Sequence, residues 1–211
     1  IEKSLAKLVS KERMSQEDAD AARGRISLSV DRADCADCDL VIEAVPEILD
    51  LKVSIFQELD GLCKPETILA SNTSSISIST IADSTNRPDK VIGMHFMNPV
   101  PIMKLVEIIS GVETDILVAE KVYQWAKSVG RNPVYAADSP GFIVNRVARH
   151  FYVESFRVEE ENVGSLQSID RLMEASGFKM GPFRLMDLIG VETNYSVTHS
   201  MFEQFKYDAK F

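Results

Sequence analysis

The first half of the chain alternates short apolar runs with amphipathic stretches, which is typical of strands that alternate with helices. The run Leu40-Val-Ile-Glu-Ala-Val45 is nearly continuous in apolar residues and predicts a strand buried on both faces. Apolar residues at helical spacing predict a helix over 50–61, closed by Gly61. The same alternation predicts further strands over 67–71, 90–94, 105–109 and 132–135, and further helices over 78–83 and 114–129.

Two short helices and a strand are predicted before that alternation begins. Apolar residues recur at helical spacing within residues 4–13. Ser15, which is followed closely by two acidic residues, has the position of an N-cap and predicts a helix that ends near Gly24. The alternation of apolar and polar residues across 26–30 predicts a short strand.

Beyond Asp138-Ser-Pro140 the apolar residues recur only at helical spacing. Helices are predicted over 143–160, 165–176, 182–189 and 191–204, separated by glycines. We therefore divide the chain into an α/β domain, residues 1–139, and an all-helical domain, residues 140–211. The alternating strands and helices of the first domain predict a mostly parallel sheet that is wrapped by helices.

Composition and charge narrow the possible classes of protein. The 211 residues are 45% hydrophobic and 26% charged, which is ordinary for a globular protein. The net charge of −9 argues against nucleic acid as a partner, and no apolar run approaches the ~18 residues of a membrane span. The three cysteines form an odd, sparse set that favours a reducing compartment. Cys35 and Cys38 have redox or metal-site spacing, but without a second pair or a nearby histidine we predict no metal site.

Three polar side chains fall where successive predicted strands begin or end. They are the hydroxyl of Ser74, the imidazole of His95 and the carboxylate of Glu107. Proton removal from an alcohol requires a hydroxyl, a base and a group that orients the base. Taken singly, Ser74 is compatible with a turn serine and Glu107 with a solvent-facing residue. Because both faces of strand 105–109 are apolar, however, a charge at Glu107 is costly unless it is paired, and the segment predicts an active site.

Five segments together resemble the 3-hydroxyacyl-CoA dehydrogenase family along nearly the whole chain. They are Asn72-Thr-Ser-Ser75, His95-Phe-Met-Asn-Pro-Val-Pro101, Met103-Lys-Leu-Val-Glu107, Asp138-Ser-Pro-Gly-Phe-Ile-Val-Asn-Arg146 and Met180-Gly-Pro-Phe183. Their order and spacing are those of the family, and the bacterial 3-hydroxybutyryl-CoA dehydrogenases are the most similar subgroup. The resemblance implies a Rossmann-type domain followed by a helical domain, NAD as cofactor and an (S)-3-hydroxyacyl-CoA as substrate. It also implies a homodimer paired through the helical domain, in a bacterial cytoplasm.

The resemblance also implies roles for individual residues. The implied catalytic residues are His95 as general base, Glu107 as its orienting acid, Ser74 and Asn145. The implied NAD contacts are Glu47, Lys52, Ser74 and Asn98, and the implied acyl-CoA contacts are Ser4, Lys11, Ser74 and Asn145. By themselves, Glu47 is equally compatible with a residue in the first turn of a helix and Lys11 with a solvated basic helix face.

Both ends of the family pattern fall outside these residues. The strand–GxGxxG–helix segment that cradles a dinucleotide pyrophosphate does not occur in the sequence, so we expect a fragment that is trimmed at both ends. Two other functions stay open. One is a nicotinamide-dependent dehydrogenase of another 3-hydroxy acid, although such relatives generally use a lysine base. The other is a non-catalytic scaffold or a module of a larger fatty-acid oxidation polypeptide.

Overall fold

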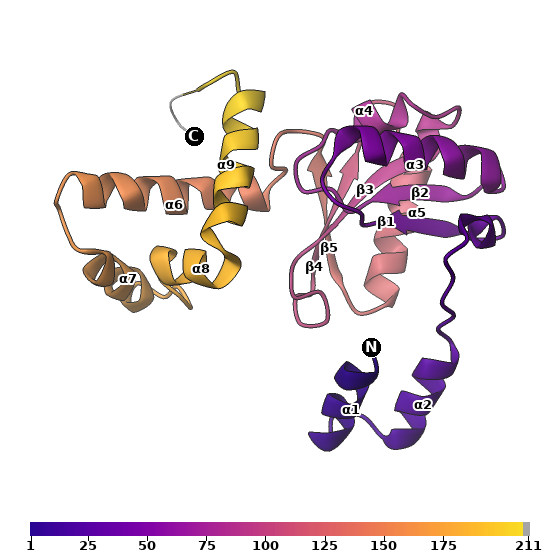
Figure 1. The fold of residues 1–211 in the computed structure, drawn as a ribbon, viewed down its shortest axis with the longest axis horizontal. Helices are drawn as coiled ribbons and strands as arrows, with labels where there is room; N and C mark the ends of the chain where they lie inside the picture. Colours follow the sequence, from indigo (N-terminus) through magenta and orange to yellow (C-terminus); the bar gives the residue numbers. More distant parts are fainter. Residues whose placement is uncertain (209–211) are drawn as a thin grey trace.

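The computed structural model describes residues 1–208, which fold into one five-stranded sheet with flanking helices and a separate helical unit (Figure 1). The strands lie in the order β1 (Leu40–Glu43), β2 (Ile68–Ser71), β3 (Val91–Phe96), β4 (Leu105–Ser110) and β5 (Asn132–Ala137). The pairs β1–β2, β2–β3 and β4–β5 are parallel, and β3–β4 is antiparallel. The predicted mostly parallel sheet is therefore confirmed. Residues 209–211, the last of the predicted helical domain, lie outside the described residues.

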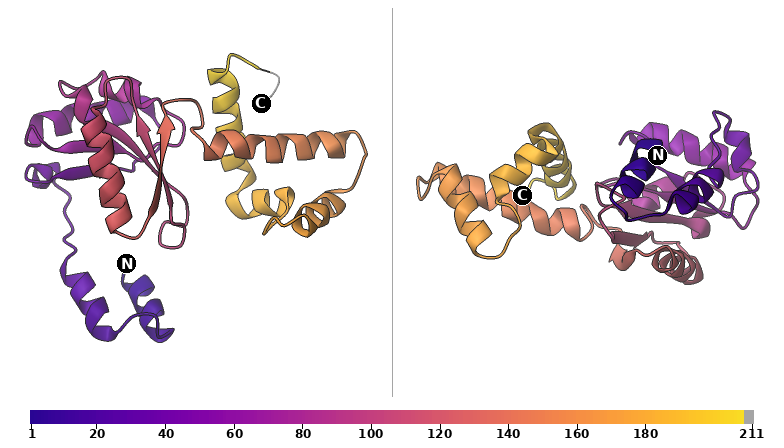
Figure 2. Two further views of the ribbon diagram at one scale, coloured as in Figure 1. Left: turned by 180° about the vertical axis from the view of Figure 1, so that it is seen from behind. Right: turned by 90° about the horizontal axis from the view of Figure 1, so that it is seen from below.

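Helices cover both faces of the sheet. The helices of this domain are α3 (Leu49–Leu62), α4 (Ile78–Ala82) and α5 (Ile116–Ser128), with 3₁₀ turns η1 (Arg32–Cys35) and η2 (Pro88–Lys90). Phe56 of α3 packs with Leu69 and Ile109 on one face, whereas Val122 of α5 packs with Ile108 on the other. Figure 2 shows α3 and α4 on one side of the sheet and α5 on the opposite side. Because successive strand residues point to opposite faces, this two-sided burial explains the continuous apolar runs.

The C-terminal unit contains α6 (Val144–Glu160), α7 (Leu166–Ala175), α8 (Pro182–Ile189) and α9 (Val191–Gln204). The buried Arg149 joins α6 to α9, because its Nη1 donates to the side-chain oxygen of Asn194 at 2.6 Å and to Thr198 Oγ1 at 2.7 Å. Gly181 precedes α8, and a Cβ there would lie 2.3 Å from Oδ1 of the buried Asp170. The glycine of Met180-Gly-Pro-Phe183 is therefore required by close packing.

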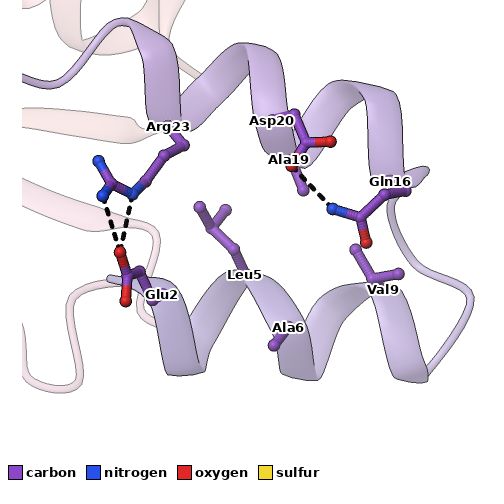
Figure 3. Close-up of a pocket in the computed structure, with 8 residues that line it drawn as sticks. All are labelled: Glu2, Leu5, Ala6, Val9, Gln16, Ala19, Asp20 and Arg23. Carbon is purple, nitrogen blue, oxygen red and sulfur yellow. Dashed lines mark hydrogen bonds and ion pairs between the residues drawn. The ribbon is translucent and has the colours of Figure 1, made fainter.

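A helical hairpin forms the N-terminal segment and stands apart from the sheet (Figure 1). It consists of α1 (Glu2–Ser10) and α2 (Gln16–Gly24), and Ser15 caps α2 as predicted by accepting a hydrogen bond from the Asp18 amide at 3.0 Å. Figure 3 shows the groove between the two helices, closed at one end by Arg23, which lies 2.8 Å from Glu2. No helix within residues 1–208 combines the length and the apolar character needed to cross a membrane.

The prediction of a strand over 26–30 is wrong. This segment is irregular, and its apolar side chains face solvent, with Leu28 90% and Val30 107% exposed. Alternation supplies a candidate apolar face, but a strand also needs a ladder partner and a surface on which to bury that face. Neither is provided for this segment by the described residues. The other predicted helices and strands are present, with ends shifted by a few residues.

One nearly buried arginine holds the C-terminal end of α3. Arg87 Nε donates to the Asp60 carboxylate at 2.6 Å, and its two Nη atoms donate to the carbonyl oxygens of Lys64 and Asp60, each at 2.6 Å. The guanidinium thus satisfies carbonyl oxygens that a helix end leaves without partners. Burial alone would raise the pKa of Asp60, but the Asn86 amide and Arg87 outweigh it and hold that pKa below its usual value.

We expect Arg87→Met to lower the free energy of unfolding by about 1.5–3 kcal/mol, because the partly buried Asp60 carboxylate would lose its charged donor and keep only its bonds from Asn86. Urea denaturation measures the change. Arg32→Met is the matched control, since Arg32 pairs with Glu58 at the surface and its loss is expected to cost about 1 kcal/mol or less. Equal losses in the two variants would contradict the role given to Arg87.

Candidate active site

The imidazole of His95 lies between a carboxylate and a hydroxyl. His95 is directly opposite Glu107 in the antiparallel β3–β4 ladder, which places both side chains on the same face of the sheet. Nδ1 of His95 lies 2.7 Å from Glu107 Oε2, and Nε2 lies 3.1 Å from Ser74 Oγ. His95 is 5% exposed and Glu107 is fully buried. The structure therefore brings these three sequence-predicted residues together.

The hydrogen bonds define the tautomer of His95. An ionised carboxylate only accepts hydrogen bonds, so Nδ1 must carry the proton that is donated to Glu107. In the neutral ring Nε2 is then an acceptor, and the Ser74 hydroxyl donates to it. The ring of Phe142 packs edge-on against the imidazole, with the ring centroids 5.7 Å apart. The arrangement presents a proton acceptor to a hydroxyl group.

Glu107 also binds the start of α6. Its Oε1 accepts hydrogen bonds from the amides of Ile143 at 2.8 Å and Val144 at 3.0 Å. The partial positive charge of a helix N-terminus favours a carboxylate at this position. The next residue, Asn145, is half-buried in the first turn of α6. Asn145 thus follows the helix end that Glu107 holds, and its contact with the substrate stays a prediction.

The turn that carries Ser74 is held by Glu47. Oε1 of Glu47 accepts hydrogen bonds from the amides of Ser74 at 2.9 Å and Ser75 at 3.1 Å, and also from the Thr73 hydroxyl. Burial alone would raise the pKa of Glu47. The bond from Thr73, the charge of Lys52 and the Ser74 amide outweigh burial and hold that pKa below its usual value. Glu47 is therefore ionised at neutral pH while it holds this turn.

Lys52 lies inside the protein. Only 1% of the residue is exposed, and its ammonium donates to Glu43 Oε1 at 2.8 Å and to the carbonyl oxygen of Val45 at 3.3 Å, and lies 3.2 Å from Glu47 Oε2. An ammonium has three protons, and these three oxygens satisfy them. The structure thus ties Lys52 to protein groups, and its contact with NAD stays a prediction. Glu47 keeps 37% of its side chain exposed.

The other predicted ligands lie on exposed segments. Asn98 is exposed in the loop after β3 and precedes Pro99 through a cis peptide bond. Ser4 and Lys11 are exposed in the α1–α2 hairpin, which Figure 1 shows apart from the sheet. Within the described part of the chain, no recorded hydrogen bond or ion pair joins these three side chains to the catalytic candidates. Their roles stay predictions.

Sequence reasoning missed several residues that organise the site. Asn72 accepts a hydrogen bond from the Phe96 amide at 2.9 Å and so ties the end of β2 to the residue after His95. Asp138 accepts from the amides of Ile78 and Ser79 and caps α4. Glu43 is a buried acid in an apolar strand. The burial argument that singled out Glu107 applies equally to Glu43 and was sufficient to find it.

Two models of one protein family match the chain. Residues 1–139 match the 3-hydroxyacyl-CoA dehydrogenase NAD binding domain, and residues 141–211 match the C-terminal domain of the same family. A 3-hydroxyadipyl-CoA dehydrogenase of Escherichia coli K12 is 47% identical over 177 residues, which are 83% of this chain and 37% of that protein. A 3-hydroxybutyryl-CoA dehydrogenase of Clostridioides difficile is 42% identical over 213 residues, covering 99% of this chain and 76% of that protein.

Solved structures of this family are similar to the chain as well. The crystal structure of 3-hydroxybutyryl-CoA dehydrogenase from Escherichia coli K12 matches with a TM-score of 0.96 and 42% identity, and the match covers 98% of this chain and 44% of that one. The chain thus spans less than half of both Escherichia coli relatives and about three quarters of the Clostridioides difficile protein.

We expect Glu107→Gln to move the proton of neutral His95 from Nδ1 to Nε2. The amide oxygen must face the Ile143 and Val144 amides, so the NH₂ group faces His95 Nδ1 and needs an acceptor there. Nitrogen chemical shifts of the labelled histidines measure the tautomer. Glu113→Gln, which changes an exposed glutamate after β4, is the control. An unchanged Nδ1–H tautomer in the Glu107 variant would contradict the geometry described here.

Proposed function

The chain belongs to the 3-hydroxyacyl-CoA dehydrogenase family, and we propose that it carries the catalytic centre of an NAD-dependent enzyme that oxidises an (S)-3-hydroxyacyl-CoA to the 3-oxoacyl-CoA. The observation that carries the proposal is the buried array in which Glu107 orients His95 and His95 Nε2 faces the Ser74 hydroxyl. A base that is oriented in this way is suited to an alcohol substrate. The names of the relatives support a coenzyme A thioester.

In the proposed reaction the protein residues bind the alcohol and remove its proton. Ser74 Oγ hydrogen-bonds the substrate 3-hydroxyl, and His95 Nε2 takes the hydroxyl proton, a role for which a neutral imidazole is suited. The electron pair of the O–H bond forms the carbonyl as a hydride leaves the same carbon. Glu107 stabilises the resulting imidazolium without taking its proton. NAD, when bound, supplies the acceptor for the hydride.

The carboxyl ends of β1 and β2 fit a dinucleotide. Open α/β sheets bind ligands outside these strand ends, and Glu47 and Ser74 follow the two strands with polar atoms that are partly exposed. We therefore assign residues 1–139 to the cofactor and residues 140–211 to the substrate and to dimer formation. The proposed cofactor contacts are Glu47, Lys52, Ser74 and Asn98, and the proposed acyl-CoA contacts are Ser4, Lys11, Ser74 and Asn145.

We propose 3-hydroxybutyryl-CoA as the substrate. The Clostridioides difficile relative is named for this compound and covers nearly the whole chain, whereas the Escherichia coli relative is named for 3-hydroxyadipyl-CoA. Both acyl groups carry the 3-hydroxyl on which the array acts. The three free thiols and the bacterial relatives support the reducing cytoplasm of a bacterium as its location.

The assay follows NADH absorbance while the full-length protein reduces acetoacetyl-CoA. We expect turnover with NADH, slower turnover with NADPH and none with free acetoacetate. Turnover of free acetoacetate without turnover of its thioester would favour a dehydrogenase of another 3-hydroxy acid. Absence of turnover with every one of these substrates would favour a non-catalytic scaffold and would overturn the proposal.

We expect His95→Gln to lower kcat by at least ~10²-fold with little change in KM, because positioned acid–base catalysis contributes on this scale. Steady-state kinetics with acetoacetyl-CoA measure both constants. His199→Gln is the matched control, since His199 is half-exposed on α9. Turnover close to that of the wild type in the His95 variant would remove this residue from the mechanism.

The C-terminal unit exposes large apolar side chains on all four helices, which favours an interface with a second copy. They include Val147 at 67%, Leu172 at 66%, Leu188 at 71% and Tyr195 at 67% exposure. We propose a homodimer through this unit. Sedimentation of the full-length protein is expected to show a dimer that Leu188→Asp weakens, while Val112→Asp, a change in the first domain, leaves it intact. A monomeric wild type would contradict the proposal.

A further inference from the structure

A chain of alternating charges, of which the first two are buried, runs from β1 to the turn that carries Ser74. Its members are Glu43, Lys52 and Glu47, and none of them has a recorded contact with His95 or Glu107 among the described residues. We propose that the buried pair Glu43–Lys52 is a positioning device that acts through Glu47 to fix where the Ser74 hydroxyl meets His95. This inference rests on the proposed function, because the position of Ser74 matters to catalysis only if its hydroxyl binds the substrate alcohol.

Glu43 anchors the chain at the end of β1. It is 5% exposed, and its Oε1 accepts from the Val45 amide at 2.6 Å and from Lys52 Nζ at 2.8 Å. Its Oε2 accepts from the Ser71 hydroxyl at 2.7 Å, and Ser71 Oγ in turn accepts from the Thr73 amide at 3.2 Å. Glu43 thus holds the start of the turn through the Ser71 hydroxyl, and it holds the Lys52 ammonium through an ion pair.

Lys52 transmits this constraint to Glu47. Its ammonium lies 3.2 Å from Glu47 Oε2, which leaves Oε1 of the same carboxylate to face the turn. Oε1 accepts from the consecutive amides of Ser74 and Ser75. The turn is therefore held from both sides, by Glu43 through Ser71 and by Glu47 at the amides.

The backbone position of Ser74 decides where its hydroxyl lies. The recorded hydrogen bond of Ser74 Oγ within the described chain is the one to His95 Nε2, at 3.1 Å. Apart from that bond, the hydroxyl position follows from the backbone that Glu47 fixes. A misplacement of about 1 Å, even from a distant change, can lower a rate by ~10²-fold. The chain of charges can therefore affect the rate of the reaction without contacting the reacting atoms.

The presence of the buried pair Glu43–Lys52 is better explained by the geometry that it imposes than by a contribution to stability. Burying a lysine and a glutamate removes both from water, and replacing such a pair with apolar residues of similar size often leaves a protein equally stable or more so. What the pair provides is a set of directional contacts that one backbone arrangement satisfies. That arrangement presents the amides of Ser74 and Ser75 to a single carboxylate oxygen.

The test is a double-mutant cycle in the full-length enzyme with acetoacetyl-CoA and NADH. Glu43→Gln keeps the shape of the side chain and removes its charge, and we expect kcat to fall on the order of 10-fold with little change in either KM. In a Ser74→Ala background the same substitution is expected to lower kcat by less than about 2-fold, because its effect passes through the hydroxyl that is already missing. Glu58→Gln, an exposed change on α3, is the matched control and should leave kcat unchanged.

Each other outcome overturns the proposal. Equal falls in kcat with and without the Ser74 hydroxyl would make Glu43 and Lys52 a structural pair only, and a change confined to the KM for NADH would make them part of cofactor binding. If Glu43→Gln does not fold, Ser71→Ala replaces it in the same cycle, because it removes one contact of Glu43 and leaves every charge in place. An inactive wild type would overturn the proposed function itself, whereas an active wild type with an additive cycle overturns only the positioning role.

Discussion

The structure depends on how one fully buried carboxylate is satisfied. Glu107 sits in an apolar strand, where an unpaired charge would be costly, and three donors compensate it: the imidazole of His95 and the amides of Ile143 and Val144. These donors come from the neighbouring strand and from the start of α6. Satisfying one side chain therefore requires the β3–β4 register, the orientation of the base and the approach of the second domain at the same time.

The same requirement recurs at the end of β1. Glu43 is also an acid in an apolar strand, and it is compensated by Lys52, by the Val45 amide and by the Ser71 hydroxyl. Buried charges of this kind seldom add net stability, but they are satisfied by few arrangements of their surroundings. The two glutamates thus specify the two sides of the site, with the base on one side and the serine turn on the other.

The local sequence pattern was sufficient to predict most helices and strands. It failed where a strand depends on a pairing partner that is distant in sequence. The apolar run of β1 and the Ser15 cap of α2 are local signals, and both elements are present. The segment 26–30 has the alternation of a strand but lacks a partner, and no local signal gives the antiparallel direction of β4. In the site, polar residues at strand ends pointed to His95, Glu107 and Ser74. The burial of Lys52 was not predicted, because lysine is seldom buried unless paired. Its partners all lie in residues 43–47, just before it, but the sequence pattern does not show that their oxygens converge on one ammonium.

The link between Glu107 and α6 has a consequence for motion. Because the same carboxylate orients the imidazole and binds the first amides of α6, the two tasks cannot be separated. Any opening that lifts α6 from the sheet also takes two donors from Glu107 and frees that side chain to turn away from His95. Such a displacement would leave His95 without the oriented carboxylate that the proposed proton abstraction requires, so the first turn of α6 would have to stay on the sheet during that step.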